Sequence, residues 1–229
     1  MVRILDFKLE RDQLQERLGN GLPSNSIILI EGPDGGGKSI LCERFTYGFL
    51  ENKITVTFIS TEMNTADFIN QMDSLNYSVS DKILSEELIF IPMFPFFGEV
   101  EFDENFMENL FNSDRIYKNE VIIFDTLSDL IIKDKSHKTI FEIIDFFKRL
   151  ISLNKTIIIT VNPHLLSEDI TKILKSIADV YFHVELRERF GVLVNFIDIV
   201  RFKMAKDRTE KQIPFRVDPG VGIAIEITA

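Results

Sequence analysis

A glycine-rich loop directly after a short apolar run is the feature of this sequence that most restricts its fold. Residues Gly32–Ser39 read GPDGGGKS and match the pattern G-x-x-x-x-G-K-[ST]. The apolar run before them, Ser26–Ile30, has the length of a buried strand, and a helical pattern follows from Lys38. A strand, a glycine-rich loop and a helix in this order predict a phosphate-binding loop. The alternative is a purely structural turn, which glycines can also form.

The residue types in this loop indicate which phosphates it holds. Three successive glycines let the backbone fold tightly, so that its N–H groups point at phosphate oxygens. Lys38 is expected to reach the β- and γ-phosphates, and the Ser39 hydroxyl to ligate Mg²⁺. We therefore expect ATP and Mg²⁺ as cofactors. The predicted nucleotide-binding residues are Gly32, Asp34, Gly35, Gly36, Gly37, Lys38, Ser39 and Ile40.

Short apolar runs alternate with longer helical patterns along the chain. The predicted strands are Ser26–Ile30, Val56–Ser60, Leu88–Ile91, Val121–Phe124 and Thr156–Val161. The predicted helices are Lys38–Leu50, Thr65–Leu75, Glu104–Phe111, Lys138–Leu153 and Glu168–Ser176. The pattern changes at Val180, after which the predicted strands are Val192–Phe202, Phe215–Val217 and Ala224–Ile227. This order predicts an α/β fold with a mostly parallel central sheet flanked by helices, antiparallel C-terminal strands, and one domain over residues 1–229.

Charge and composition restrict the location and partners of the chain. The formal net charge is −10, so the broad positive field that drives non-specific nucleic-acid binding is missing, and no nucleic-acid partner is expected. The single cysteine, Cys42, excludes an internal disulfide and fits a reducing compartment. The apolar runs are strand-sized, and the first ten residues do not resemble a signal peptide. We expect a cytoplasmic protein.

Two acidic residues stand at the ends of predicted strands. Asp125 ends the apolar run in VIIFDTLSDL, where a carboxylate could hold Mg²⁺ through a water. The alternative for Asp125 is a helix N-cap. Glu62 follows the strand Val56–Ser60, on the ligand side of an open α/β sheet, where it could position an attacking water. The alternative for Glu62 is a solvated acid near a helix start.

The loop, Glu62 and Asp125 in this order resemble the RecA superfamily and, within it, the KaiC-like proteins. The segments LPSNSIILIEGPDGGGKS, ISTEMNTADFINQM and IVRFKMAKDRTEKQIPFRVDPGVGIAIE extend the resemblance over roughly residues 20 to 229. The resemblance implies a RecA-like fold and a γ-phosphate-sensing role for Asn162 at the end of the fifth strand. Asn162-Pro163 is equally a plain turn signal.

The sequence departs from the KaiC-like pattern at two positions. KaiC-like ATPases usually carry two adjacent acids after the second strand, and here Met63 takes the second place. Their Lys-Met-Arg triplet, which reaches a neighbouring subunit's γ-phosphate, reads Lys203-Met204-Ala205. Arg208 could replace the missing arginine. An arginine finger is worth about 10³–10⁵ in rate, so we expect ATP binding with very slow or no hydrolysis.

The acidity, the single domain and a phenylalanine-rich loop most resemble the accessory proteins of the archaellum motor. This resemblance implies a ring-forming regulatory protein that assembles with the secretion-type motor ATPase FlaI and the membrane platform, at the inner face of the membrane. Around Lys203 and Arg208 lies the main basic cluster, which would face a neighbour's nucleotide or be merely a solvated hairpin. An active KaiC-type ATPase or autokinase is the rival hypothesis, and a RecA-like DNA-binding protein is the weaker one.

Overall fold

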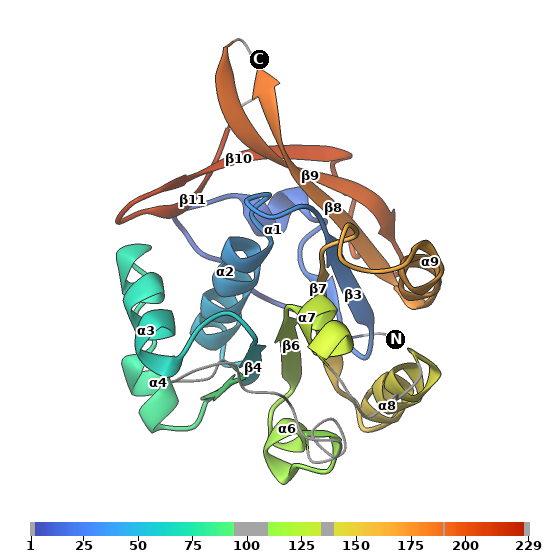
Figure 1. Cartoon of the computed structure of the whole chain (residues 1–229). Coiled ribbons are helices and arrows are strands. Elements are labelled where there is room, and N and C mark those ends of the chain that lie inside the picture. Colours follow the sequence, from blue (N-terminus) through green and yellow to red (C-terminus); the bar gives the residue numbers. More distant parts are fainter. Residues whose placement is uncertain (1–2, 94–109, 134–139, 190, 227–229) are drawn as a thin grey trace.

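A mixed sheet runs through the molecule and carries helices on both faces (Figure 1). The computed structural model describes residues 3–93, 110–133, 140–189 and 191–226. In these residues the main sheet has nine strands in the order β11-β10-β9-β8-β3-β7-β6-β4-β5. The parallel strands are β3 (Ile27–Glu31), β4 (Val56–Ser60), β5 (Leu88–Pro92), β6 (Val121–Asp125), β7 (Thr156–Val161) and β8 (Val180–Arg189).

The C-terminal strands turn the sheet antiparallel. β9 (Val192–Phe202) returns along β8, β10 (Gln212–Asp218) pairs with β9, and β11 (Gly222–Ile225) forms the edge. The predicted fold class, a mostly parallel sheet with antiparallel C-terminal strands, is therefore confirmed. β8 was not predicted as a strand because only its first half is consistently buried, while its second half continues into a projecting hairpin (Figure 1). The last predicted strand begins and ends about two residues earlier than expected.

Alternation along the central strands directs side chains into two separate cores. Ile28, Ile30 and Phe58 pack on one face with α2 (Lys38–Glu51) and α3 (Thr65–Ser74). Ile27, Leu29 and their neighbours pack on the other face under the helices α6 (Asp114–Lys118), α7 (Leu127–Lys133), α8 (Ile140–Ser152) and α9 (Glu168–Ile177). Strands buried on both faces explain the continuous apolar runs of the sequence.

The remaining elements are short. They are β1 (Ile4–Leu5), α1 (Leu14–Arg17), β2 (Leu22–Pro23) and α4 (Ser80–Leu84). The part of the chain that holds the first three packs against α2 through Leu5, Phe7 and Leu14. Most of the predicted helix Glu104–Phe111 lies outside the described residues. Within the described part of the chain, no helix has the length and hydrophobicity needed to cross a bilayer.

Candidate functional site

The glycine-rich loop leaves the carboxyl end of β3 and is packed from behind by the C-terminal strands. The N–H of Gly32 donates to the Val161 carbonyl at the end of β7, 3.0 Å away. A Cβ atom on Gly32 would lie 2.0 Å from the Val184 carbonyl oxygen of β8. Gly37 has a φ of +98°, and a Cβ there would lie 2.8 Å from the Phe215 ring of β10. Only glycine fits these two positions, so the neighbouring strands fix the shape of the loop.

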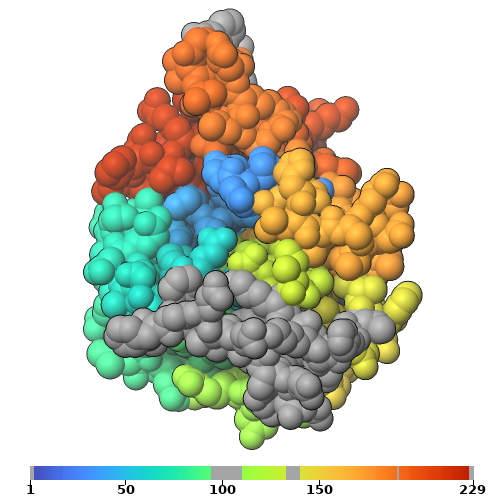
Figure 2. Space-filling view, viewed as in Figure 1, coloured from blue at the N-terminus to red at the C-terminus, as the bar shows by residue number. Residues whose placement is uncertain are grey.

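Lys38 is the first residue of α2 and is buried inside the loop. Its ammonium group donates to the carbonyl oxygens of Gly32 and Pro33, at 2.9 and 2.8 Å. The Asp34 carboxylate is 3.8 Å from the same nitrogen and is 84% exposed. The charge is therefore enclosed by the loop that the sequence predicts to wrap around phosphates. In Figure 2 the blue part of the chain, which includes this loop, reaches the surface below the red and orange C-terminal strands.

A cavity of about 270 Å³ opens beside the loop. Its lining brings together the loop and residues from three other parts of the chain: Asp34, Gly35, Gly37, Lys38, Ser39, Ile40, Glu62, Asn195 and Val217. Most of the nucleotide-binding residues predicted from the sequence thus lie on one hollow, together with Glu62. Asn195 on β9 was not predicted; it donates to the Gly36 carbonyl at 3.1 Å and so supports the loop.

Asp125 ends β6 and is 1% exposed. Its Oδ1 accepts a hydrogen bond of 2.7 Å from the Thr160 hydroxyl. Burial raises the pKa of Asp125, and the nearby hydroxyls of Thr160 and Ser39 oppose that rise. The second carboxylate oxygen, Oδ2, is one of three buried side-chain atoms without a hydrogen-bond partner in the described residues.

An unpartnered carboxylate oxygen beside Ser39 fits a Mg²⁺ site. Mg²⁺ takes one or two protein carboxylates and completes its shell with water and substrate phosphates. No group of three His, Cys, Asp or Glu side chains that could hold a metal occurs among the described residues, so a metal here would depend on Ser39, Asp125 and a ligand. The N-cap alternative for Asp125 does not fit, because α7 begins at Leu127 and leaves Thr126 at the capping position.

Glu62 lies just beyond β4, at the same edge of the sheet. Its backbone N–H donates to the Ser60 hydroxyl at 3.3 Å, and its side chain lines the cavity with Lys38. Partial burial raises the pKa of Glu62, and the charges of Asp125 and Asp129 raise it further. Asp129, on the first turn of α7, was not predicted as part of the site. Glu62 is exposed and stands two residues before Asn64, the N-cap of α3, so the alternative of a solvated acid near a helix start also describes it. Its side chain nevertheless lines the cavity beside the loop.

Asn162 reaches the loop directly from the end of β7. Its side-chain amide donates to the Asp34 carboxylate at 2.8 Å. Its Oδ1 accepts the His164 N–H at 3.0 Å, so the turn suggested by Asn162-Pro163 is also present. The Ser128 hydroxyl accepts the backbone N–H of Asn162 at 2.8 Å. The side chain is thus held at the loop by contacts on both sides.

Glu43 is an acidic residue near the site that was not predicted from the sequence. It lies on α2, four residues after Ser39, and is 1% exposed. Burial raises its pKa from 4.5 to about 8, with a further contribution from the charge of Asp125. Gln71 on α3 donates to its Oε2 at 3.4 Å. The i, i+4 spacing from Ser39 was the one signal in the sequence that could have placed Glu43 near the loop.

Comparison with known proteins identifies the family. A family model described as "ATPase: KaiC" matches residues 8–228. The chain is 42% identical over 229 residues to "Archaeal flagellar ATP-binding protein FlaH" of Methanocaldococcus jannaschii. The alignment covers 100% of this chain and 98% of the relative. The chain belongs to the KaiC-like ATPases and, within them, to the FlaH family. The two resemblances stated from the sequence, to KaiC-like proteins and to archaellum accessory proteins, are thereby confirmed.

Solved structures agree with this family and fold. The crystal structure of flagellar accessory protein FlaH from Methanocaldococcus jannaschii has a TM-score of 0.94 and 41% identity, covering 99% of this chain and 100% of that one. A KaiC-like protein from Pyrococcus horikoshii has a TM-score of 0.78 at 18% identity, covering 99% and 100% of the two chains. The second likeness concerns the fold alone.

In this KaiC-like fold, Lys203 and Arg208 lie away from the loop of their own chain. Lys203 follows β9, and its N–H donates to the Asp179 carbonyl at 3.0 Å. Asp179 in turn donates its N–H to the carbonyl of Ile27, the first residue of β3, at 2.8 Å. The loop begins at the opposite end of β3, about 16 Å away at 3.3 Å per residue. Arg208 is exposed on the connection between β9 and β10.

Proposed function

We propose that this chain binds ATP with Mg²⁺ and uses the bound nucleotide to assemble with other copies of itself. The proposal rests on the distance between two half-sites, the phosphate loop and Lys203, which lie at opposite ends of β3. The loop lies at the carboxyl end of this strand, and Lys203 is tied to its start through Asp179. Lys203 therefore contacts the nucleotide of a neighbouring copy, as the Lys-Met-Arg triplet of KaiC-like proteins implies.

The loop residues divide the work of binding. Lys38 neutralises phosphate charge, the loop N–H groups and the start of α2 hold phosphate oxygens, and Ser39 with Asp125 holds the metal. Bound Mg²⁺ would supply charge neutralisation on the β- and γ-phosphates. Asn162, already hydrogen-bonded to Asp34, is placed to sense the outer phosphate. The printed name of the relatives, an ATP-binding protein, supports this ligand.

Hydrolysis is proposed to be very slow. Ala205 stands where the family carries an arginine, and Met63 stands where it carries a second acid. Loss of an arginine finger alone lowers the rate by about 10³–10⁵-fold. Glu62 lines the cavity beside Lys38, so a residual water-positioning role is retained. A nucleotide that is held and rarely cleaved suits a switch that stays assembled.

The partners follow from the family. The relatives are named flagellar proteins, and this supports a role in archaellum assembly and rotation. In this proposal residues 1–229 form one nucleotide-binding domain, several copies form a ring, and the ring binds the motor ATPase FlaI and the membrane platform. The protein would then be cytoplasmic and peripheral at the inner face of the membrane.

Light scattering at matched protein concentrations tests the proposal. ATP with Mg²⁺ should give a higher molar mass than ADP or no nucleotide, because a ligand that bridges two copies stabilises the assembly by about 2.7 kcal/mol at a hundredfold excess over its dissociation constant. Lys203→Ala should reduce this assembly more than it reduces ATP affinity measured at low protein concentration. FlaI should co-sediment with the ATP form and not with the ADP form.

Lys148→Ala is the matched control, because Lys148 is an exposed lysine on α8 whose ion pair is with Asp145 of the same helix. It should assemble as the wild type does. Equal masses with ATP, ADP and no nucleotide would exclude nucleotide-driven assembly. Turnover of several ATP per second by the wild type would instead favour an active ATPase.

A further inference from the structure

An N-terminal segment, residues 11–20, lies between the helix that follows the phosphate loop and the β9–β10 loop, residues 203–211. The β9–β10 loop carries Lys203 and Arg208, the two candidates for contact with a neighbouring copy. In Figure 1, α1, the helix of the N-terminal segment, is seen between α2 and the strands β9 and β10. The contacts on its two sides make a continuous path between the two half-sites.

The first contact joins the N-terminal segment to α2. Asp12 accepts hydrogen bonds from Nε and Nη2 of Arg44 at 2.6 and 2.8 Å. The Arg44 side chain is 0% exposed, and the Asp12 side chain is 1% exposed. Arg44 also donates to the Phe7 carbonyl at 3.1 Å. A bidentate, buried pair of this kind fixes orientation as well as distance, so it holds the segment against α2 in one geometry.

The second set of contacts joins the N-terminal segment to the β9–β10 loop. The N–H of Asp207 donates to the Gly19 carbonyl at 3.2 Å, and the N–H of Glu210 donates to the Arg17 carbonyl at 3.0 Å. Gly19 has a φ of +76°, and a Cβ there would lie 2.8 Å from the Asp207 carbonyl oxygen. The two backbones therefore lie against each other, and a side chain at residue 19 would separate them.

Side chains add to these backbone contacts. Nη1 of Arg17 donates to both carboxylate oxygens of Glu210, at 2.9 and 3.2 Å. Asn20 donates to the Asp207 carboxylate at 3.2 Å. Arg208 thus lies between two residues that bind the N-terminal segment, Asp207 directly before it and Glu210 two positions after it. The position of Arg208 depends on contacts from outside its own loop.

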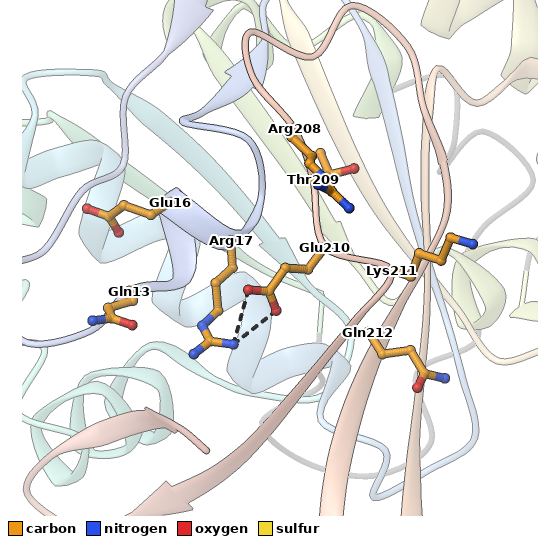
Figure 3. Close-up of a pocket in the computed structure, with 8 residues that line it drawn as sticks. All are labelled: Gln13, Glu16, Arg17, Arg208, Thr209, Glu210, Lys211 and Gln212. Atoms are coloured by element: carbon orange, nitrogen blue, oxygen red, sulfur yellow. Dashed lines mark hydrogen bonds and ion pairs between the residues drawn. The ribbon is translucent and has the colours of Figure 1, made fainter. Parts of the chain in front are cut away.

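A cavity of about 770 Å³ lies between the two segments. Gln13, Glu16 and Arg17 line one side, and the consecutive residues Arg208, Thr209, Glu210, Lys211 and Gln212 line the other. Figure 3 shows Arg17 and Glu210 joined across this space. Arg208 and Lys211 are both exposed and lie on the same side of this cavity.

We infer that the N-terminal segment fixes the position of the β9–β10 loop relative to α2, the helix that follows the phosphate loop, with Asp12, Arg17 and Glu210 as positioning residues for the contact between copies. This inference rests on the function proposed above. A loop held in its binding geometry loses less conformational freedom when it meets a neighbour than a free loop does. The tether therefore strengthens assembly without touching the nucleotide of its own chain.

Glu210→Ala tests the inference with two independent measurements. Hydrogen exchange of the nucleotide-free protein should show faster exchange of the Asp207 and Glu210 amides, because the Arg17 contact is lost. The protein concentration needed for ATP-dependent assembly should rise by about fivefold, as for a partly exposed ion pair worth up to about 1 kcal/mol. ATP affinity at low protein concentration should stay within about twofold of the wild type.

Two further variants separate positioning from general stability. The charge swap Arg17→Glu with Glu210→Arg should restore slow exchange and assembly. Glu87→Ala removes a comparable ion pair with Lys82, 3.0 Å long, near the β5 edge of the sheet, and should change neither. If Glu210→Ala does not fold, Asn20→Gly removes the side-chain contact to Asp207, accommodates the φ of +63° at this position, and should give the same changes at smaller size.

The outcomes distinguish this inference from the proposed function. Unchanged amide exchange in Glu210→Ala overturns the positioning role whatever the wild type does with ATP. A wild type that assembles with ATP, together with a Glu210→Ala variant that assembles equally well, also overturns it. A wild type with the same mass in ATP, ADP and no nucleotide overturns the proposed function. It also overturns the effect of the Arg17–Glu210 contact on assembly.

Discussion

Lys203 and Asp179 form an ion pair of 3.1 Å at the end of the sheet opposite the phosphate loop. The second carboxylate oxygen of Asp179 accepts the N–H of Ile27 at 3.2 Å, so the pair is anchored to the start of β3. Lys203 is 53% exposed, and this ion pair holds its ammonium group against its own chain. A lysine that is to contact a neighbour's phosphate must therefore exchange one anion for another.

Asp179→Asn should strengthen ATP-dependent assembly. The asparagine oxygen can still accept the Ile27 N–H, while the charge that competes for Lys203 is removed. Exposed ion pairs are worth about 0.2–1 kcal/mol, so the concentration for half-assembly should fall by at most about fivefold. Light scattering against protein concentration measures the shift.

The same substitution made in a Lys203→Ala chain is the control. With no lysine to release, Asp179→Asn should then leave assembly unchanged, and the double-mutant cycle isolates the pair. Weaker assembly of Asp179→Asn in the wild-type background would mean that Asp179 orients Lys203 instead of competing for it.

Lys38→Ala should remove most of the ATP affinity and leave the fold intact. The ammonium group bonds to loop carbonyls of Gly32 and Pro33 and contributes no packing to the cores. Hydrogen bonds to charged groups are worth about 1.5–3 kcal/mol, so calorimetry should show a loss of roughly ten- to hundredfold. Lys172→Ala, which removes an exposed lysine from α9, should bind ATP as the wild type does. Unchanged affinity in Lys38→Ala would refute the assignment of the loop.

Glu62→Gln should lower whatever ATP hydrolysis remains. Glu62 faces the cavity with Lys38 and Ser39, and a positioned base is typically worth about 10²–10⁴ in rate. The drop should be smaller here, because catalytic groups that act together are not additive and Ala205 has already removed one of them. Phosphate release in single-turnover experiments measures it. A variant as fast as the wild type would show that Glu62 has no part in hydrolysis.

The acidity of Glu62 should be visible in the same assay. Partial burial and the charges of Asp125 and Asp129 raise the pKa of Glu62 above 4.5. As the pH falls, Glu62 therefore becomes protonated at a higher pH than an ordinary glutamate does. Residual hydrolysis of the wild type should fall as the pH is lowered toward that pKa. In Glu62→Gln this component of the pH dependence should be absent.

The sequence was most informative where burial acts on a whole strand. The strands Val56–Ser60, Thr156–Val161 and Val192–Phe202 were predicted with the bounds that the structure has. The first two are buried on both faces, which leaves continuous apolar runs, and the third alternates along much of its length. The glycine loop was recognisable because its residue types are set by local backbone geometry and by close approach of other strands, as at Gly32.

Contacts between distant segments were not predictable from the sequence. The order of the strands and the tether between Arg17 and Glu210 depend on tertiary packing across 193 residues of chain. The burial of Glu43 likewise depends on the packing of α3, which brings Gln71 beside it. A glutamate on a helix is ordinarily exposed, and no local pattern distinguishes one that is covered.

Glu43→Gln should stabilise the protein at alkaline pH. In the folded chain Glu43 keeps its proton up to about pH 8, while in the unfolded chain it loses the proton near 4.5. Between these values unfolding releases a proton, so raising the pH favours the unfolded state. The favourable contribution of the protonated carboxyl is complete below about pH 4.5 and is lost as the pH rises through about 8. Glutamine cannot lose a proton and retains the acceptor for Gln71.

Denaturant unfolding at a series of pH values between 5 and 9 provides the measurement. At the acidic end the two proteins should have similar free energies of unfolding. At the alkaline end the variant should be more stable by up to about 5 kcal/mol, the value of a 3.5-unit pKa difference at 1.36 kcal/mol per unit. Glu51→Gln is the control, because Glu51 is an exposed glutamate on the same helix and its substitution should give no widening gap. A gap that is constant with pH would show that the pKa of Glu43 is the same in the folded and unfolded chains, and would contradict the prediction.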